Sequence, residues 1–257
     1  MPAPAAPKEP DPSETRVAAV KQVLDTKLAQ YGGTWSATYI DLERGRDVTV
    51  NDEKLVAASL VKLYIMLAVF DGIEHGTITD DANVNALLKQ MITVSSNEAA
   101  NGLLSRIGNG DDKAAIATVT ATAQRYGFTS SEELRTLTGM ASGNAVENWT
   151  STRDCGSFLS QAYAGTLVSK NASERMMQLL LGQTRRTKIP AGVPSGVKVA
   201  NKTGELVSAY CDAYRSAVAI VFGTHPYVLA VMSNDISSAV APSQITELSR
   251  AVWDAAQ

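Results

Sequence analysis

The sequence predicts an α/β chain of the α+β type, in which an antiparallel sheet built from both chain ends carries an inserted helical lobe. The first observation is the order of the elements: a helix, two strands, a long helical block, three strands and a final helix. The second is the length of 257 residues, which suffices for a large hydrophobic core. The third is a hydrophobic content of 45%, which is typical of globular chains and not of disordered ones.

The first fifty residues predict a leader, a helix and a hairpin. Residues 1–14 are rich in Pro and Ala and show neither a charged n-region nor an apolar h-region, so we expect a flexible leader and no signal peptide. Over residues 15–30, Val and Leu recur with the helical period until a pair of glycines ends the pattern. Residues 34–41 and a segment ending near Val50 then read as two strands joined by a turn.

The middle of the chain is predicted to be the helical lobe. From residue 59 to about 190, Ala, Leu and Met recur at helical spacing between glycine breaks. Within this block, residues 127–151 are rich in Gly, Ser, Thr and Asn and predict a long ordered loop, of a kind that often carries function. We therefore expect one domain over 15–257, with a sheet lobe of about 15–58 and 191–257 and a helical lobe of about 59–190.

The last part of the chain returns to strands and ends in a helix. The strands are expected at 196–206, 214–222 and 226–234, where β-branched and aromatic residues are frequent. An amphipathic pattern from residue 243 onward predicts the final helix.

Charge and composition exclude several classes of function. The chain has 23 Lys and Arg against 26 Asp and Glu, a net charge of −3, which argues against nucleic-acid or anionic-membrane partners. The two histidines, His75 and His225, are far apart and show no ligand spacing, so no zinc site is expected. No apolar stretch reaches membrane-spanning length. The two cysteines, Cys155 and Cys211, would form one disulfide or none.

A serine and a lysine three residues apart stand in the otherwise apolar segment AASLVKLYIM, as Ser59 and Lys62. One interpretation is a helix cap followed by a lysine that extends to water. The other is a nucleophile with its own proton acceptor beside it. The pair alone does not decide between the two.

Two further patterns follow in order. Ser95, Ser96 and Asn97 precede a helical segment and are interpreted either as a helix cap or as part of a site. Lys202-Thr203-Gly204 lies within a predicted strand, where an edge lysine before a bulge glycine is the structural alternative. Each pattern alone is weak, but all three in this order, each in a fitting element, are rare by chance.

Together, S-x-x-K, S-x-N and K-T-G resemble the motif set of class A β-lactamases and penicillin-binding proteins. The stretch ITVSSNEAANGLL, with Asn101, is similar to that family's S-D-N region, and NWTSTRDCGSFL is similar to the exit from its omega loop. The resemblance covers nearly everything from about residue 15 onward. It implies the β-lactamase/transpeptidase-like fold, β-lactams or the D-Ala-D-Ala peptides that they mimic as substrates, and no metal or organic cofactor.

The spacing of the catalytic candidates has a chemical reason. A serine hydroxyl needs a base within hydrogen-bond reach, and residues three apart share one face of a helix. A lysine can serve as that base if burial lowers its pKa. The resemblance accordingly implies Ser59 as the nucleophile and Lys62 as its base. Ser95 would pass a proton to the departing nitrogen, and Lys202 would supply positive potential.

The resemblance also implies a set of substrate-binding residues. Asn97 would hold the substrate amide, and Thr203 would hydrogen-bond the substrate carboxylate. Gly204 completes the K-T-G motif, and the backbone N–H of the next residue, Glu205, would face the developing oxyanion together with the N–H of the nucleophile. Arg215 opens the following strand and is either a carboxylate-binding arginine or an ordinary exposed strand-end residue.

The chain departs from the family pattern at two places. Ser96 stands where the family has the aspartate of S-D-N, a residue that looks structural there. The deacylating glutamate of an E-x-x-L-N motif is absent, because Glu132, Glu133 and Glu147 are all out of frame. Glu147, beside Asn148, is either its replacement or a solvent-facing carboxylate. We therefore expect deacylation to be slower than acylation.

The predicted function is a serine β-lactamase-like hydrolase that opens β-lactam rings through an acyl-enzyme on Ser59. A D-Ala-D-Ala peptidase and a β-lactam sensor module without turnover remain open as alternatives. The resemblance further implies a monomer that is exported to the periplasm, the cell surface or the medium, with the signal segment absent from this sequence. In such an oxidising compartment Cys155 and Cys211 would be able to pair, although nothing in the sequence places them within bridging distance.

Overall fold

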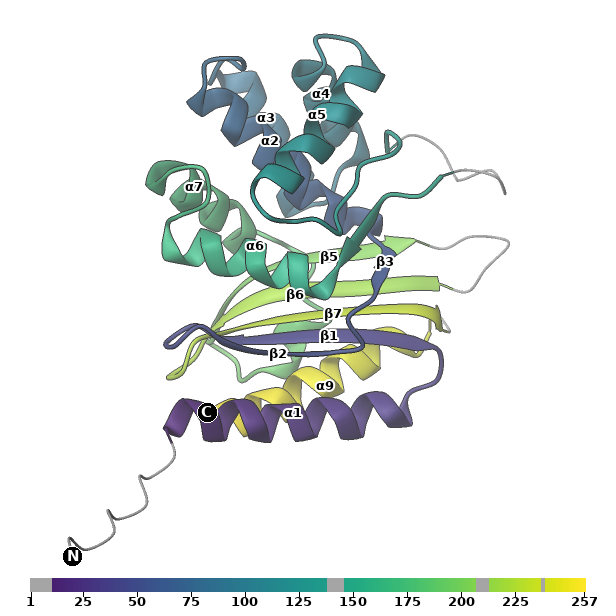
Figure 1. Cartoon of the computed structure of the whole chain (residues 1–257), viewed down its shortest axis with the longest axis vertical. Coiled ribbons are helices and arrows are strands. Elements are labelled where there is room, and N and C mark those ends of the chain that lie inside the picture. Colours follow the sequence, from purple (N-terminus) through teal and green to yellow (C-terminus); the bar gives the residue numbers. More distant parts are fainter. Residues whose placement is uncertain (1–10, 138–145, 207–212, 237–238) are drawn as a thin grey trace, which may run out of the picture.

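The computed structural model describes residues 11–137, 146–206, 213–236 and 239–257. Their central feature is a five-stranded antiparallel sheet in the order β2–β1–β7–β6–β5 (Figure 1). The strands, in that order, are Arg46–Val50, Thr34–Asp41, Tyr227–Ile236, Ala213–Phe222 and Lys198–Leu206. Because the strands come from both chain ends and helices lie between them in sequence, the predicted fold class is confirmed.

Helices from the two ends of the chain cover one face of this sheet. They are α1 (Pro12–Gln30) and α9 (Ala241–Ala256), with the short α8 (Ile189–Gly192) packed against α9 (Figure 1). Side chains of a strand alternate between its two faces, so every second residue of β1, β6 and β7 points into this layer. The buried cluster between sheet and helices includes Val20, Leu24, Tyr39, Ala219, Leu229, Val231, Leu248 and Val252.

Helix α1 begins at Pro12, whereas the helical period predicted a start near residue 15. Asp11 caps the helix, and its side chain accepts a hydrogen bond from the Ser13 amide at 2.9 Å. Proline is favoured at the first helical position, where no amide hydrogen is needed. The Asp-Pro start signal therefore lies inside the segment that was expected to be leader, and residues 1–10 of that segment lie outside the described residues.

The opposite face of the sheet carries α6 (Thr152–Ala164) and, beyond it, the rest of the helical lobe (Figure 1). The other helices of the lobe are α2 (Lys62–Glu74), α3 (Ala82–Thr93), α4 (Asn97–Ile107), α5 (Asp112–Arg125) and α7 (Lys170–Leu181). Helix α2 contacts α3, α4 and α5, and every residue from Lys62 to Gly72 is buried. A helix that is apolar on all sides must lie in a core, which explains the long apolar run after Ser59.

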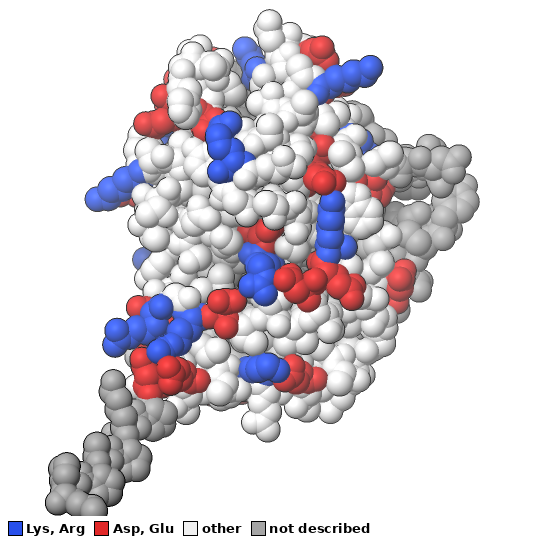
Figure 2. Space-filling view, in the orientation of Figure 1, with Lys and Arg blue, Asp and Glu red and all other residues white. Residues whose placement is uncertain are grey.

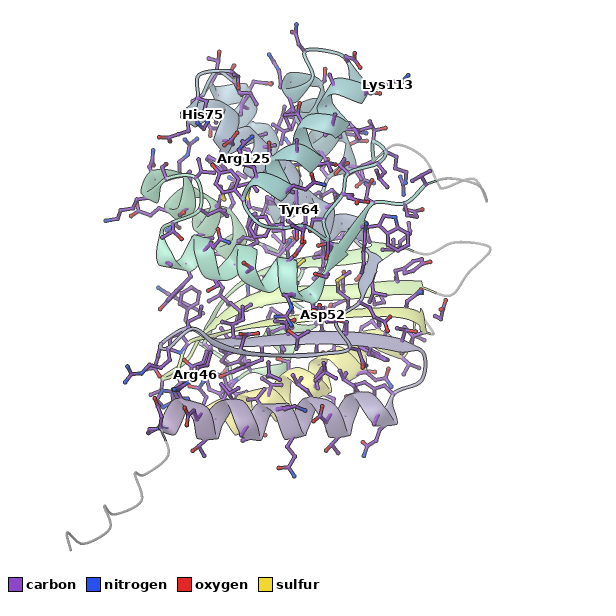
Figure 3. All side chains as sticks on the ribbon, in the orientation of Figure 1. Arg46, Asp52, Tyr64, His75, Lys113 and Arg125 are labelled. Atoms are coloured by element: carbon purple, nitrogen blue, oxygen red, sulfur yellow. The ribbon has the colours of Figure 1, made fainter. Side chains whose placement is uncertain are left out.

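Aromatic rings fill the interior of this lobe around Tyr64. Its ring lies 5.7 Å from the Phe128 ring and 6.0 Å from the Phe158 ring, measured between centroids. In Figure 3, Tyr64 lies inside the lobe, whereas His75 and Lys113 lie at its surface. Such ring pairs contribute to stability beyond the area that they bury.

The loop between α5 and α6 is tied down at both ends. Its exit forms β4 (Trp149–Ser151), which pairs antiparallel with β3 (Lys54–Val56) just before the Ser59 segment. Its entrance is held by the buried carboxylate of Asp154, which accepts hydrogen bonds from the Ser130 amide at 2.8 Å and the Ser131 hydroxyl at 2.7 Å. Residues 138–145 of the predicted loop lie outside the described residues.

Cys155 lies on the buried side of α6, and within the described residues it has no disulfide partner. Its sulfur lies 3.6 Å from the hydroxyls of Tyr64 and Thr150, and burial raises the pKa of the thiol to about 12. Its proposed partner Cys211 lies outside the described residues. A buried thiol of high pKa is unreactive.

Charged residues of both signs mix on the surface. On the face that Figure 2 shows, Lys and Arg side chains alternate with Asp and Glu side chains. Ion pairs of this kind include Arg46 with Asp11 at 3.0 Å and Arg153 with Asp52 at 2.7 Å. Within the described residues, no helix is both long and apolar enough to cross a membrane.

The Asp41 carboxylate joins α1 to the β1–β2 hairpin and predicts a pH-dependent contribution to stability. It accepts hydrogen bonds from Ser13 Oγ at 2.8 Å, Arg16 Nη2 at 2.9 Å and the Glu43 amide at 2.8 Å. Burial alone would raise the pKa of Asp41, but these hydrogen bonds outweigh it and lower the pKa. The contribution is therefore present above the unfolded-state value of about 3.9 and is lost as pH falls through the folded-state pKa.

We expect Asp41→Asn to lower the free energy of unfolding at pH 7 by about 1–3 kcal/mol, because buried donors lose their charged acceptor. Urea unfolding of both proteins at pH 7 and at about pH 2.5 measures the effect, and the difference should shrink at the lower pH. An equal difference at both pH values would show that the carboxylate charge contributes nothing.

Candidate active site

Ser59 lies in a short 3₁₀ turn, Ala58–Val61, that runs directly into α2. Ala58 has a positive φ of 45°, which is uncommon for alanine and typical of strained backbone at functional sites. The turn places Ser59 and Lys62 on one side, so that Lys62 Nζ is 3.1 Å from Ser59 Oγ. The predicted proximity of this pair is thus present in the structure.

The Lys62 amine is buried among oxygen atoms. Besides Ser59 it contacts Asn97 Oδ1 at 2.7 Å, the Ser95 carbonyl oxygen at 2.7 Å and Ser95 Oγ at 3.2 Å. Burial, and to a lesser extent the positive charge of Arg185, lower the pKa of Lys62 to about 8 against the opposing effect of the Glu133 carboxyl. A lysine in this environment is neutral in part near physiological pH, so it can accept a proton from a serine.

Ser95 is not the N-cap of α4, although the sequence allowed that interpretation. Ser96 caps α4 by accepting a hydrogen bond from the Ala99 amide at 3.1 Å. Ser95 adopts a positive φ of 63°, and its hydroxyl lies 2.9 Å from Lys202 Nζ. The Ser95 hydroxyl therefore lies between two lysine amines, one from each lobe.

Strand β5 brings Lys202 to this cluster along the edge of the sheet. Lys202 is fully buried, and its amine also contacts the Thr203 carbonyl oxygen at 2.7 Å. Burial lowers the pKa of Lys202 well below its ordinary value, and the charge of Lys62 lowers it further. Thr203 is buried too, with 4% of its surface exposed.

Gly204 allows β5 to approach the Ser59 turn. A Cβ atom at this position would lie 2.3 Å from Ser216 Oγ, 3.0 Å from the Ala57 carbonyl oxygen and 3.3 Å from the Ser59 amide nitrogen. The distance to Ser216 Oγ on β6 is shorter than real side chains show, and the two distances to the Ala57–Ser59 backbone are tight, so a larger residue would displace β5 from these neighbours. Ser59 and Glu205, the residue after Gly204, consequently meet at one junction.

A small cavity of about 70 Å³ opens at this junction. Ser59, Asn97 and Glu205 line it together with residues of the loop between α5 and α6. The complete lining is Ala58, Ser59, Asn97, Arg135, Leu137, Glu147, Asn148, Glu205 and Leu206. The cavity thus joins the Ser59 turn, the start of α4, strand β5 and the loop.

Arg215 lies opposite Glu205 on β6 but is not among the described residues that line the cavity. It is 7% exposed, so the alternative of an ordinary exposed strand-end arginine is wrong. One of its nitrogens, Nη1, lies 3.2 Å from the Tyr214 carbonyl oxygen and 3.4 Å from that of Leu206, and its buried Nε has no hydrogen-bond partner among the residues that the structure describes. Its guanidinium is therefore directed at backbone oxygens.

The three glutamates of the loop have different environments. Glu132 pairs with Lys54 at 2.7 Å, and Glu147 pairs across the cavity wall with Arg135 at 2.8 Å. Glu133 is 1% exposed, and burial raises the pKa of its carboxyl to about 8 against the opposing charges of Arg135 and Lys62. Its Oε2 atom is buried and has no hydrogen-bond partner within the described part of the chain.

Asn148 connects Glu133 with the Ser59 segment. Its side-chain amide lies 3.3 Å from Glu133 Oε1, and its backbone oxygen accepts a hydrogen bond from the Ala57 amide at 2.8 Å. Its Oδ1 atom accepts from the amides of Leu134 and Arg135 at 2.7 and 3.0 Å. The motif frame excluded Glu133 from consideration, and no local pattern marked it, because its proximity to Lys62 arises only through this folded loop.

Lys188 is a further buried lysine that the sequence did not single out. It is 1% exposed, and its amine lies 3.0 Å from the Ser216 carbonyl oxygen and 3.3 Å from that of Gly204. It also pairs with Glu205 Oε1 at 3.0 Å. No motif surrounds Lys188, and its partners are contributed by two distant strands.

The described part of the chain contains no group of three or more His, Cys, Asp or Glu side chains that could hold a metal ion. The groups available at the junction are hydroxyls, amines, side-chain amides, backbone N–H groups and the glutamates Glu147 and Glu205. A serine hydroxyl hydrogen-bonded to a buried amine is the arrangement of an activated nucleophile.

The fold is that of β-lactamases and other penicillin-recognising serine hydrolases. The chain belongs to the β-lactamase enzyme family, whose model matches residues 17–86 and 79–256. Among curated protein sequences, none is detectably similar to this chain.

Solved structures share the fold over almost the whole chain. A β-lactamase from Chitinophaga pinensis is 19% identical with a TM-score of 0.83, and 93% of this chain and 99% of that one are covered. A β-lactamase from Sphaerobacter thermophilus is 22% identical with a TM-score of 0.75, covering 95% and 97% of the two chains. The protein PBP-A is 21% identical with a TM-score of 0.78, covering 93% and 95%. These TM-scores, at 19–22% identity, establish a common fold.

The lowered pKa of Lys62 predicts the pH dependence of acylation by a β-lactam. Since only the neutral amine can accept the Ser59 proton, the second-order acylation rate constant should rise as pH increases through about 8 and then level off. Lys62→Ala should lower this constant by about 10²–10⁴-fold and remove the rise. Stopped-flow measurement with a chromogenic cephalosporin between pH 6 and pH 10 tests both; an unchanged profile in Lys62→Ala would exclude Lys62 as the base.

Proposed function

We propose that this protein is a serine β-lactamase-like hydrolase that opens β-lactam rings through an acyl-enzyme on Ser59. The observation that carries the proposal is the chain of contacts Ser59–Lys62–Ser95–Lys202, with distances of 3.1, 3.2 and 2.9 Å. It offers a nucleophile, a proton acceptor and a route for the proton to a leaving nitrogen. The proposed mechanism needs neither a metal nor an organic cofactor.

In the proposed acylation, neutral Lys62 takes the proton of Ser59 while the oxygen attacks the β-lactam carbonyl carbon. The amides of Ser59 and Glu205 stabilise the oxyanion. When the ring C–N bond breaks, Lys62 returns a proton through the Ser95 hydroxyl to the departing nitrogen. Asn97 holds the substrate amide and orients Lys62, to which it is bonded at 2.7 Å.

Lys202 and Thr203 hold the substrate carboxylate in this scheme. The pKa of Lys202 is lowered by burial in the absence of substrate, and an arriving carboxylate raises it again by stabilising the charged amine. Charged Lys202 then supplies positive potential both at the Ser95 hydroxyl, 2.9 Å away, and where the carboxylate binds. Arg215 stays a weaker candidate for this role, because its guanidinium is directed at backbone oxygens.

We assign deacylation to Glu133 in preference to Glu147, and we propose that it is the slower step. Glu147 is neutralised by its ion pair with Arg135. Glu133 interacts with Lys62, has an unpartnered oxygen and touches Asn148, which lines the cavity. A carboxyl of pKa about 8 is mostly protonated at pH 7, and one that is 1% exposed meets water rarely, so the acyl-enzyme accumulates.

A D-Ala-D-Ala peptidase is the second candidate function. It is favoured by the burial of Glu133 behind Asn148, because a site with restricted access of water to its base suits transfer to other acceptors or a long-lived adduct. Either activity acts on extracellular substrates, so we propose that the protein works outside the cytoplasm. We further propose that it acts as a monomer.

Incubation with benzylpenicillin, followed by intact-mass and peptide mass analysis, tests the nucleophile. One drug mass should appear on the peptide that contains Ser59, and Ser59→Ala should abolish it. Steady turnover of a chromogenic cephalosporin would support the lactamase, whereas a persistent adduct with cleavage of a D-Ala-D-Ala peptide would support the peptidase. A persistent adduct without peptide cleavage would indicate a sensor, and an adduct on another residue would overturn the proposal.

Paired glutamate variants test the assignment of deacylation. Glu133→Gln should lengthen the lifetime of the acyl-enzyme by about 10²-fold or more, the range of a lost general base. Glu147→Gln is the matched control from the same loop and should change that lifetime by less than about threefold. Time-resolved mass spectrometry after removal of free drug gives both lifetimes. The reverse order of effects would transfer the role to Glu147.

A further inference from the structure

The last turn of α3 is completed by residues from a distant part of the chain. The final carbonyl groups of a helix have no partner within the helix, and in α3 the segment that follows α7 supplies donors for two of them. Gln183 Nε2 donates to the Ile92 carbonyl oxygen at 2.6 Å. The amide and the hydroxyl of Thr184 both donate to the Thr93 carbonyl oxygen at 3.0 Å. Ser95 follows two residues later, so these bonds fix the direction in which the chain reaches it.

The same segment is also bonded to strand β5, which belongs to the other lobe. Gln183 Oε1 accepts a hydrogen bond from the Arg185 amide at 2.9 Å. The Arg185 carbonyl oxygen in turn accepts one from Asn201 Nδ2 at 3.1 Å, and Asn201 directly precedes Lys202 on β5. The Gln183 side chain thus joins the end of α3, which leads to Ser95, to the strand that carries Lys202.

Both side-chain amides of this bridge are buried. Gln183 is 3% exposed and Asn201 is 1% exposed. Hydrogen bonds between buried polar groups make a structure rigid, because breaking one leaves a group without a partner and away from water. The bridge therefore sets the spacing of the two segments in addition to the direct contact of 2.9 Å between Ser95 and Lys202.

We propose that Gln183 is a positioning residue for the transfer of a proton to the departing nitrogen. Together with Asn201 it holds the chain after α3 against β5, so that the Ser95 hydroxyl stays 2.9 Å from Lys202 and 3.2 Å from Lys62. The inference rests on the proposed function, in which Lys62 returns a proton through Ser95 as the ring C–N bond breaks. Gln183 is not among the described residues that line the cavity of the site, so it acts through Ser95.

The role of Ser95 gives this inference a specific signature. A displaced Ser95 slows acylation where the leaving group needs a proton, as the nitrogen of a β-lactam does. A thiophenolate leaves as an anion without a proton, because an aromatic thiol is far more acidic than an amine. A merely structural role of Gln183 would slow both reactions alike.

The test compares acylation of Ser59 by benzylpenicillin and by the phenylacetylglycyl thioester of 3-mercaptobenzoic acid. Both compounds carry a phenylacetylamino group and a carboxylate, and they differ in the leaving group. Gln183→Met should lower the second-order rate constant for the penicillin by about 10–10²-fold, as a misplacement of about 1 Å does. The constant for the thioester should change by less than about threefold. Rapid-quench intact-mass analysis measures the first constant, and absorbance of the released thiol measures the second.

Asn201→Ala breaks the bridge at its other end and guards against misfolding of the first variant. Asn201 Oδ1 has no hydrogen-bond partner within the described residues, so this change removes the bond to the Arg185 carbonyl oxygen and leaves no donor unpaired. It should lower the penicillin-to-thioester ratio several-fold. Gln178→Met is the matched control, because Gln178 is an exposed glutamine near the end of α7, and it should leave the ratio within about twofold.

A double-mutant cycle measures whether Gln183 acts through Ser95. Ser95→Ala removes the hydroxyl that carries the proton and should lower penicillin acylation by about 10²–10⁴-fold. In that background, Gln183→Met should lower the rate constant by less than about twofold more. A further loss of about tenfold would place the effect of Gln183 elsewhere and overturn the inference.

A penicillin-to-thioester ratio that stays unchanged in both Gln183→Met and Asn201→Ala, while the two compounds still react, would also overturn this inference and leave the proposed function standing. If neither compound acylates Ser59 in the unmodified protein, the proposed function is overturned, and this inference with it.

Discussion

The burial of two lysine amines against one serine hydroxyl is the constraint on which the site depends. Lys62 and Lys202 are both fully buried, and both contact Ser95 Oγ, at 3.2 and 2.9 Å. Burial of a charged amine is unfavourable unless anions or several oxygens surround it, and here mainly uncharged oxygens are in contact. The pKa of each lysine is therefore lowered. Each lysine binds its proton more tightly in the unfolded chain, so at neutral pH the two lysines reduce the stability of the fold. In return, Lys62 can provide the neutral amine that the proposed acylation uses.

This constraint explains how the two lobes are joined. Lys62 comes from the core of the helical lobe, where α2 is apolar on every side, and Lys202 comes from the edge strand of the sheet. The chain between α3 and α4 contributes Ser95 in a strained conformation, which is possible because Ser96 takes over the helix cap. Gly204 lets the edge strand approach the Ser59 turn closely enough to share the cavity. A site of this kind exists only when both cores are formed, since neither lobe contains it alone.

Much of the fold followed from local patterns, and the rest from contacts that no local pattern encodes. Strand alternation and helical period identified the sheet of both chain ends, and the spacing of Ser59 and Lys62 predicted their contact because residues three apart share a helix face. The helix start at Pro12 was missed although its Asp-Pro signal was present, because the apolar period begins later. Glu133 was set aside because it does not fit the spacing of the E-x-x-L-N motif, although the folded loop places it near Lys62. Lys188 was not singled out because its partners, Gly204 and Ser216, lie on strands that are distant in sequence. Long-range contacts of this type depend on the whole fold.

The central claim of this account is that the pKa of Lys62 is lowered to about 8, so that part of the protein carries a neutral Lys62 amine near physiological pH. The most direct test is an NMR titration of the protein labelled at the lysine ε-carbons, with Lys62→Met to assign the Lys62 signal and Lys188→Met to assign that of Lys188, whose pKa is also lowered to about 8. We expect the Lys62 signal to titrate near pH 8. A Lys62 signal that titrates near 10.4, the value of an ordinary exposed lysine, would contradict the account, because the amine would then be charged and unable to accept the Ser59 proton.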